Sequence, residues 1–562
     1  MFTGDFKRRA LYSQRSPHLE NRPQDATLTV GGGDEHSGSV SELLRRINQV
    51  SDNADTRLNL GTELAEIGQP MEALVHLQRA VELDPSLVRG HIRLGNLLRD
   101  LSRTGEAVEA YGRALELRPD DPFILSNLGN AWLDLSESGR AIDCYRQSLE
   151  IYPNAPATLS NLIFTMHYDS GIRPEEIAAA HREWGRRFGQ ALDQVEPPER
   201  PKYDRCRPMR IGFLSADFRY HPVGRMASVL WANLNRDQVM PIVYDNSSDE
   251  SSAKRRYRKK VAEWHNIVSL SDDAVVNRIR ADRLDALVDF SGHTSGNRLG
   301  VLAQKPVPVQ ITMLAYPNTT GLSAVDWRIT DSQADPSSAD LFYVEQLLRL
   351  PSVAWVYGAP DASPEPGGLP CLGGAPFTFG CLNNPAKISA AAVDSWSAIL
   401  RACPQARLML LVRDDPVHEG LLVAKFERYG IGAGQLLFTA KVPELSYLEL
   451  HNRIDLMLDP FPYNGGVTTG DCLWMETPIL TMKGDSYVSR QGVSLLTAVG
   501  MPELIAADRE ELVVKAAGWC KNPQQLAKLA EGLRGRMLHS PLMDHAGYAR
   551  QLTEAFERMI TA

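Results

Sequence analysis

The sequence predicts an α-helical solenoid followed by two α/β domains, each built around a parallel sheet. Three observations carry this prediction: a 34-residue period over residues 57–156, an alternation of strand-like and helix-like runs after residue 208, and a Pro- and Gly-rich stretch at 358–376 that divides the alternating region. The chain of 562 residues is long enough for about three to four domains, and 43% hydrophobic with 23% charged residues is a globular composition.

Charge and cysteine content narrow the classes of function. Sixty Lys+Arg against 69 Asp+Glu give a net charge of -9, so the broad basic field of a nucleic-acid-binding protein is missing, and the run KRRYRKK at 254–260 is interpreted as a solvated helix face. Seven cysteines without a C-x-x-C pair argue against a disulfide framework or a zinc site and for a reducing cytosol. The N-terminus lacks an apolar signal region, and no stretch approaches about 18 apolar residues, so we expect a soluble, cytoplasmic protein without a membrane partner.

Residues 1–40 are expected to form a flexible arm, because they include a triple glycine and few large apolar residues to offset the entropy of ordering. Residues 41–195 hold the repeats. Four kinds of position recur at the 34-residue step, a glycine after leucine, an alanine, a Leu or Tyr, and a proline: Gly61, Gly95 and Gly129; Ala73, Ala107 and Ala141; Leu77, Tyr111 and Tyr145; Pro85, Pro119 and Pro153.

These columns have a physical meaning. Small residues let two antiparallel helices approach closely, the Leu or Tyr fills the space between them, and the proline ends the second helix of each unit. The pattern resembles the tetratricopeptide repeat, so residues 41–195 are predicted to form a superhelix that ends in capping helices. By itself such an array is typical of a scaffold without chemistry.

The two α/β domains are expected on either side of the stretch at 358–376. A Pro-rich linker at 196–208 leads into the first domain, predicted over 207–357, with strand-like runs at 210–214, 241–245, 284–290, 307–314 and 325–330. The second domain is predicted over 376–540, with runs at 377–382, 407–412, 435–440, 455–459 and 478–482, and residues 541–562 are expected to form a C-terminal helix. Two such Rossmann-like halves imply a ligand-binding cleft at the carboxyl ends of their strands.

Candidate residues in the first α/β domain follow its strands. Asp217 and His221 lie in SADFRYHPVGR, where a base with a nearby carboxylate can remove a hydroxyl proton, although a loop histidine before proline is more often structural. His293 and Arg298 lie in DFSGHTSGNR, where a ligand contact and a tight turn with a satisfied histidine are equally compatible with the pattern. The run LAYPNTTG from residue 314 is a weaker candidate, a turn with exposed amides and hydroxyls.

In the second α/β domain, Lys387 follows the first strand and can place a positive charge on a diphosphate leaving group. Thr468, Thr469 and Asp471 follow a glycine pair at the start of a predicted helix, where free N–H groups and hydroxyls can receive an anion and the carboxylate can bind ribose hydroxyls. The alternative for this stretch is an ordinary helix cap. The sequence contains neither a P-loop nor a strand followed by G-x-G-x-x-G, which argues against ATP hydrolysis and hydride transfer.

Taken together, the repeats and the motifs DFRYHP, SGHTSG, AYPNTTG, NNPAKI and NGGVTTGDCLWMETPILTM resemble the O-linked N-acetylglucosamine (O-GlcNAc) transferase family, including its bacterial homologues, over residues 57–560. The resemblance implies a GT-B fold of two Rossmann-like domains. It also implies an inverting transfer of N-acetylglucosamine from UDP-GlcNAc to Ser or Thr of proteins that the repeats hold, with no cofactor and no metal.

The resemblance also implies roles for residues at matching positions. His221 or Asp217 is the candidate base, Lys387 stabilises the leaving group, and Asp471 binds the ribose. The remaining expected contacts with the UDP-sugar are Pro222, Leu314, Ala315, Asn384, Val442, Tyr447, Thr468 and Thr469.

The chain departs from the animal members of this family in three ways. Its repeat array is short, the long insert between the two halves is absent, and Gly466-Val467 stand where those enzymes have His and Thr. Donor and acceptor preference therefore stay open, and a relative that uses UDP-glucose or GDP-fucose is one alternative. The other is a repeat scaffold with a nucleotide-binding but inactive transferase half. The enzyme is favoured because all the motifs that a donor needs occur together.

Overall fold

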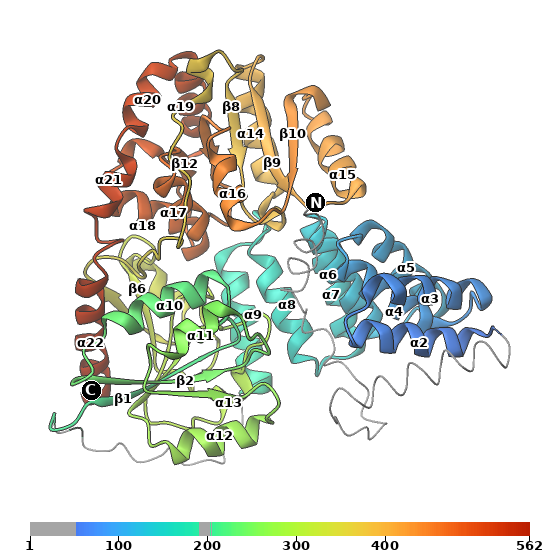
Figure 1. Cartoon of the computed structure of the whole chain (residues 1–562), viewed down its shortest axis with the longest axis horizontal. Helices are drawn as coiled ribbons and strands as arrows, with labels where there is room; N and C mark the ends of the chain where they lie inside the picture. Colours follow the sequence, from blue (N-terminus) through green and yellow to red (C-terminus); the bar gives the residue numbers. More distant parts are fainter. Residues whose placement is uncertain (1–51, 190–202, 204) are drawn as a thin grey trace, which may run out of the picture. The chain divides into compact units, whose positions relative to one another are not determined.

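A computed structural model describes residues 52–189, 203 and 205–562 (Figure 1). The expected arm at 1–40 and most of the linker at 196–208 lie outside the described residues. The described residues divide into two compact units: the first comprises those up to Thr165 together with Val412–Ala424, and the second comprises those within 166–411 and 425–562.

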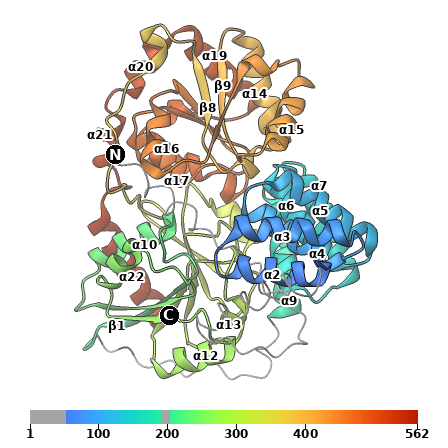
Figure 2. The same cartoon turned by 45° about the vertical axis from the view of Figure 1, so that its right-hand side comes forward.

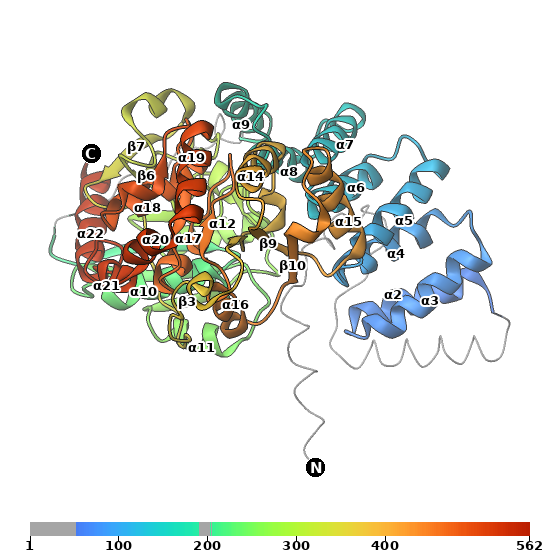
Figure 3. The same cartoon turned by 90° about the horizontal axis from the view of Figure 1, so that it is seen from above.

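The first unit is an array of paired helices, α2 with α3, α4 with α5 and α6 with α7, which follow one another as in Figures 2 and 3. The helices are α2 (Ala54–Glu66), α3 (Pro70–Leu83), α4 (Val88–Asp100), α5 (Thr104–Leu117), α6 (Pro122–Asp134), α7 (Ser138–Ile151) and α8 (Pro156–Met166). The next helix, α9 (Pro174–Phe188), belongs to the second unit, so the boundary between the units falls inside the segment expected at 41–195.

The repeating glycine and aromatic columns make the contacts inside each helix pair. A Cβ atom on Gly95 would lie 2.7 Å from Cε1 of Tyr111, and one on Gly129 would lie 2.7 Å from Cε1 of Tyr145. Both rings are buried, and each hydroxyl donates to an asparagine of the partner helix, at 2.6 and 2.7 Å. The tyrosine ring can lie this close to the helix backbone only because the facing residue has no side chain.

The second unit contains two parallel sheets. The first has seven strands in the order β3-β2-β1-β4-β5-β6-β7, and all of its neighbouring pairs are parallel. Its strands are β1 (Met209–Ser215), β2 (Val239–Asp245), β3 (Glu263–Asn266), β4 (Ala286–Asp289), β5 (Gln310–Thr312), β6 (Trp327–Asp331) and β7 (Gln346–Leu350). Its helices are α10 (Pro222–Asn233), α11 (Ser252–Arg258), α12 (Asp272–Ala281) and α13 (Leu299–Ala303).

The second sheet has six strands in the order β10-β9-β8-β11-β12-β13. They are β8 (Thr378–Cys381), β9 (Arg407–Val412), β10 (Leu436–Ala440), β11 (Leu456–Leu458), β12 (Ile479–Met482) and β13 (Ile505–Ala506). The helices after β8 are α14 (Ala390–Ala402), α15 (Pro416–Glu427), α16 (Glu444–His451), α17 (Val467–Trp474), α18 (Gln491–Ala498), α19 (Arg509–Lys521), α20 (Pro523–Ala530), α21 (Leu533–Leu538) and α22 (His545–Thr561). Most of α15 belongs to the first unit.

The predicted fold class, repeats followed by two α/β domains, is confirmed by this architecture. Three strands were not anticipated: β3, β7 and the two-residue β13. All three are edge strands, and β3 is half exposed, so none needs the apolar run by which a buried strand is found in a sequence. The C-terminal helix α22 packs on α10 and β7 of the first sheet domain (Figure 3). In the part of the chain that the structure describes, no helix is long and apolar enough to span a membrane.

Candidate active site

The candidate site in the second sheet domain lies where the chain leaves β11 and turns through Gly465 and Gly466 into α17. Asp459 follows β11 and is buried, and its carboxylate accepts hydrogen bonds from the Gly465 N–H (2.6 Å) and the Thr481 hydroxyl (2.8 Å). A Cβ atom on Gly465 would lie 2.7 Å from the Thr469 hydroxyl oxygen, so the turn packs directly on the first turn of α17. Asp459 therefore holds the glycine turn in place.

Lys387 lies beside this turn. It is the last residue of the short helix η4 (Pro385–Lys387) after β8, and its ammonium group donates to the carbonyl oxygen of Asn464 at 2.7 Å. Its Nζ also lies 4.2 Å from the centroid of the Tyr463 ring. Burial lowers the pKa of Lys387, and the negative charge of Asp459 opposes that shift. A cation next to the N-terminal end of a helix makes this corner suited to an anion.

Two asparagines follow β8 in different surroundings. Asn384, which the resemblance singled out, is exposed, and its side chain accepts a hydrogen bond from the Ala386 N–H at 3.1 Å. Asn383 is only 2% exposed, and neither polar atom of its side chain has a hydrogen-bond partner among the described residues. Its Oδ1 atom faces the glycine turn, 3.2 Å from the place of a Cβ on Gly465. A buried amide without partners is costly unless a ligand or water binds it, so Asn383 joins the candidate site.

Asn383 was not among the residues expected from the sequence. A polar residue directly after a strand is the one pattern that could have indicated it, and that pattern applies equally to Asn383 and Asn384. Which of the two is buried depends on how the chain turns into η4, and that turn is not encoded in a recognisable pattern.

Asp471, on the second turn of α17, is 7% exposed. Its Oδ1 atom accepts a hydrogen bond from the Tyr357 hydroxyl at 2.6 Å and lies 3.7 Å from the Arg225 guanidinium. Burial raises the pKa of Asp471 to about 6, while the charge of Arg225 and hydrogen bonds from Tyr357 and Tyr447 act in the opposite direction. At neutral pH the group is therefore mainly an ionised acceptor.

The other expected donor contacts of this domain differ in accessibility. Tyr447 on α16 and Thr468 on α17 are half buried, and a hydrogen bond joins their side chains. Val442 is also half buried, in the loop before α16. Thr469 is fully buried and donates to the Gly465 carbonyl at 3.1 Å, so its hydroxyl serves the turn itself.

In the first sheet domain, Asp217 and His221 lie together between β1 and α10. The Nδ1 atom of His221 accepts a hydrogen bond from the Val223 N–H at 3.3 Å and lies 3.8 Å from Asp217 Oδ1, while Pro222 is the first residue of α10. Burial lowers the pKa of His221, and the charge of Asp217 opposes this shift. The ring is therefore neutral near pH 7, and in the tautomer that accepts from Val223 its Nε2 atom carries the proton.

Leu314 and Ala315 follow β5 in a turn that is unusual for residues with side chains. Leu314 has a φ angle of 72°, and the Ala315 N–H donates to the Met313 carbonyl at 3.2 Å. Both residues are half buried. A left-handed non-glycine residue costs about 1 kcal/mol or more, and such residues are concentrated at binding sites.

Other candidates of the first sheet domain have hydrogen-bond or ion-pair partners within the fold. His293 is 3% exposed, its Nε2 atom lies 2.9 Å from the Thr320 carbonyl oxygen, and burial lowers its pKa to about 4. Arg298 pairs with Asp272 at 2.7 Å. Within the AYPNTTG turn, the Thr320 hydroxyl and N–H both bind the buried carboxylate of Glu345.

Hydrogen bonds link the segment of the first sheet domain that carries Asp217 and His221 to α16 of the second sheet domain. From the loop and first turn of α10, the Tyr220 hydroxyl and the Arg225 guanidinium bind the two carboxylate oxygens of Glu444, at 2.5 and 2.8 Å. Since Arg225 also faces Asp471, the segment that contains Asp217 and His221 lies next to α16 and α17.

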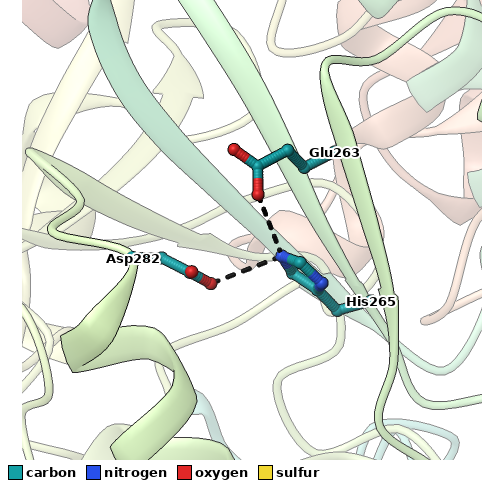
Figure 4. A group of neighbouring side chains, drawn as sticks. All are labelled: Glu263, His265 and Asp282. Atoms are coloured by element: carbon teal, nitrogen blue, oxygen red, sulfur yellow. Dashed lines mark ion pairs between the residues drawn. The ribbon is translucent and has the colours of Figure 1, made fainter.

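One group of side chains has the composition of a metal site. Glu263, His265 and Asp282 are the one set of at least three such groups, within the described ranges, whose ligand atoms lie within 4.8 Å of one another (Figure 4). His265 Nε2 faces both carboxylates, at 3.5 and 3.3 Å. However, Arg278 donates to His265 Nδ1 at 2.9 Å, and the Tyr244 hydroxyl donates to Asp282 at 2.6 Å. The group is therefore an ion-pair network at the edge of the first sheet.

Two parallel-sheet domains preceded by a repeat array are the architecture expected of glycosyltransferases that carry tetratricopeptide repeats. The chain belongs to glycosyl transferase family 41, whose family model matches residues 196–359 and 372–552, and a tetratricopeptide repeat model matches residues 95–136. The family expected from the sequence motifs is thus confirmed.

Individual proteins support this membership. The chain is 33% identical over 408 residues to a probable UDP-N-acetylglucosamine--peptide N-acetylglucosaminyltransferase SPINDLY of Solanum lycopersicum, covering 71% of this chain and 43% of that protein. It is 27% identical over 364 residues to the probable transferase SEC of Arabidopsis thaliana, covering 62% and 37%. The chain thus spans less than half the length of these curated relatives. A solved structure of a mutant O-GlcNAc transferase from Thermobaculum terrenum superposes with a TM-score of 0.83 at 28% identity, covering 95% of this chain and 98% of that one.

Proposed function

We propose that the protein is an inverting, metal-independent glycosyltransferase that moves N-acetylglucosamine from UDP-GlcNAc to Ser or Thr hydroxyls of proteins. The observation that carries this proposal is the position of Lys387, a partly buried cation fixed beside the glycine turn that begins α17. Family membership and the activities named for the relatives SPINDLY and SEC support the same assignment.

In the proposed donor complex, the second sheet domain binds the nucleotide. Asp471 accepts the ribose hydroxyls, and Tyr447 packs on the uracil, with Val442 supplying backbone contacts. The diphosphate lies at the start of α17, next to Thr468 and the asparagines at 383 and 384. Thr469 contributes by holding the turn, since its hydroxyl is already bonded to Gly465.

The transfer requires stabilisation of the negative charge that develops on the leaving UDP and removal of the proton of the acceptor hydroxyl. The acceptor oxygen forms a bond to C1 of the sugar as the bond from C1 to the diphosphate breaks, so negative charge develops on the leaving UDP. Lys387 and the helix N–H groups stabilise that charge without a metal ion. Leu314, Ala315 and Pro222 border the sugar in this proposal.

The proton of the acceptor hydroxyl must leave during the same step. Asp217 and His221 are the candidates to receive it. The hydrogen bond from Val223 to His221 Nδ1 places the ring proton on Nε2, which suits His221 for donating to a substrate oxygen. The basic lone pairs in this pair of residues then belong to the Asp217 carboxylate.

The acceptor proteins are proposed to bind along the repeat array, and the reaction is proposed to occur in the cytoplasm, which the unpaired cysteine pattern supports. The test is transfer of labelled N-acetylglucosamine from UDP-GlcNAc to protein acceptors with a chelator present. Transfer that survives the chelator supports the proposal. Binding of UDP without transfer would favour the inactive scaffold, and transfer from UDP-glucose or GDP-fucose alone would reassign the donor.

A further inference from the structure

Arg225 connects the two sheet domains at the proposed nucleotide site. It lies in the first turn of α10, and one guanidinium nitrogen donates to Glu444 at 2.8 Å while the other lies 3.7 Å from Asp471 Oδ1 (α10, α16 and α17 in Figure 1). Its side chain is 20% exposed. The guanidinium carbon also lies 5.5 Å from the centroid of the Tyr357 ring, whose hydroxyl binds the same Asp471 oxygen at 2.6 Å.

The residues that contact Arg225 are themselves held in place by other contacts of the fold. Tyr357 is buried, its carbonyl accepts from His545, and a Cβ on Gly470 would lie 2.4 Å from its ring, so the tyrosine packs directly against α17. Glu444 is held from the other side by the Tyr220 hydroxyl at 2.5 Å. The guanidinium group is therefore placed next to Asp471 by groups from three separate segments.

The charged and titratable groups around Asp471 come from every element packed against it. Arg225 on α10 provides the positive charge, Glu444 on α16 provides a negative charge, and Tyr357 and Tyr447 donate hydrogen bonds. The neighbouring thiol of Cys472 is fully buried, and the pKa of the thiol is raised by that burial. Arg225 is thus the cation that opposes the effect of burial on Asp471.

We propose that Arg225 is a positioning residue for donor recognition, which acts by holding the Asp471 carboxylate in an ionic contact that prepares it to receive the ribose hydroxyls. Glu444 keeps Arg225 in this place. This inference rests on the proposed function, in which Asp471 is the ribose ligand.

A defined dependence on pH follows. Asp471 has a pKa of about 6, raised by burial, so in the native protein it is ionised above about pH 6 and binds ribose best there. Removal of the Arg225 charge raises this pKa further, by about one unit, because an opposite charge at this distance favours ionisation. Donor affinity would then decline at a higher pH than in the native protein. The negative charge of Glu444 raises the pKa of Asp471, so Glu444→Gln should move the decline to lower pH.

The experiment is calorimetric titration of the full-length protein with UDP-GlcNAc over a series of pH values. This ligand is chosen because both of its phosphates are esterified, so no phosphate proton titrates near neutrality. The variants are Arg225→Gln, Arg225→Lys and Glu444→Gln. The matched control is Arg256→Gln, which removes an exposed pair with Asp361 in the same domain.

We expect Arg225→Gln to move the midpoint of the affinity decline up by about one pH unit, to bind about fivefold more weakly near pH 6 and to recover above about pH 8. Arg225→Lys should keep most of the native profile, and Arg256→Gln should not change it. In a protein that already carries Asp471→Asn, the carboxyl group is absent, so Arg225→Gln should cause no shift in the pH dependence of UDP-GlcNAc affinity.

Two results would overturn the inference: a weakening by Arg225→Gln that is the same at every pH, or a shift that persists in the Asp471→Asn background. A wild-type protein that binds no UDP-GlcNAc at any pH would instead refute the proposed function.

Discussion

The ammonium nitrogen of Lys387 lies 2.7 Å from the carbonyl oxygen of Asn464, so a cation is fixed at the turn that leads into α17. Because Lys387 comes from the loop after β8 and Asn464 from the loop after β11, two neighbouring parallel strands bring them to one edge of the sheet. This is the edge where ligands of parallel sheets bind.

Substitution Lys387→Met is expected to lower kcat by about 100-fold or more, because the charge that develops on the leaving diphosphate loses its cation. The affinity for UDP should change much less, since the helix N–H groups and Asp471 remain. Initial rates at saturating donor test this, with Lys528→Met on the exposed face of α20 as the matched control. Equal losses in binding and in kcat would argue against a role in the transition state.

Substitution Asp217→Asn is expected to lower kcat by about 100-fold or more, with donor affinity within about threefold of wild type, because an amide cannot accept the acceptor proton. His221→Asn should mainly raise the KM for the acceptor. The control is Asp237→Asn at an exposed position. If His221→Asn were the more damaging variant in kcat, the assignment of the base would pass to His221.

The second unit should lose stability in acid through buried histidines such as His451. His451 is 1% exposed, its Nε2 atom lacks a hydrogen-bond partner in the described part of the chain, and burial lowers its pKa to about 4 from 6.5. Between these two pH values the unfolded chain binds a proton that the folded protein does not, so the free energy of unfolding falls as the pH falls, by about 1.4 kcal/mol per pH unit.

Between about pH 6 and about pH 4.5, the free energy of unfolding of the His451→Leu variant should therefore depend less steeply on pH than that of wild type. The difference in slope should correspond to the binding of about one proton. Urea denaturation at a series of pH values measures this slope. Above about pH 7 wild type and variant should both show no contribution from this group, and an unchanged slope in acid would contradict the explanation.

The close helix contacts of the repeats can be tested with two glycines. Gly129→Ala should lower the free energy of unfolding by about 1–3 kcal/mol, because the new Cβ would lie 2.7 Å from the Tyr145 ring. Gly112→Ala, where no described atom lies within 4 Å of the new Cβ, should raise it by about 0.5–1 kcal/mol through helix propensity. Thermal denaturation of both variants gives the comparison. Similar effects would mean that the tyrosine column does not need glycine.

Removal of residues 57–156 should reduce transfer to protein acceptors by about tenfold or more while UDP affinity stays within about threefold, because the repeats are proposed to hold the acceptor. Transfer to a short peptide serves as a second readout. Equal loss of donor binding and protein transfer would contradict this division of roles.

The contacts inside the repeats could be predicted from the local sequence pattern alone. Gly95 and Tyr111 are 16 residues apart in the sequence and come from the two helices of one pair, so a fixed spacing was enough to predict that they meet. The strands β1, β2, β8 and β9 were likewise predictable, because buried parallel strands are continuous apolar runs.

The site was only partly predictable for a physical reason. Lys387 could be singled out because it follows a strand, and Asp471 because it follows a glycine pair near the start of a helix. The helix begins at Val467, so Asp471 lies on its second turn and not at the start that the sequence suggested. The charged neighbour of Asp471 is Arg225, which lies 246 residues away along the chain, and no spacing predicts that pairing. The same holds for Asn383, whose buried, unpartnered amide depends on how η4 packs.

The sequence by itself determined the repeat architecture, the two parallel sheets, the family and the motifs at the strand ends, because these depend on periodicity and on local turn chemistry. The tertiary structure alone decided which polar groups can bind a ligand and which already bind other groups of the protein. Thr469 and His293 make internal hydrogen bonds, while Arg225 lies next to Asp471. That difference arises because hydrogen bonds and pKa values depend on distances and burial between segments remote in sequence, which a linear pattern does not record.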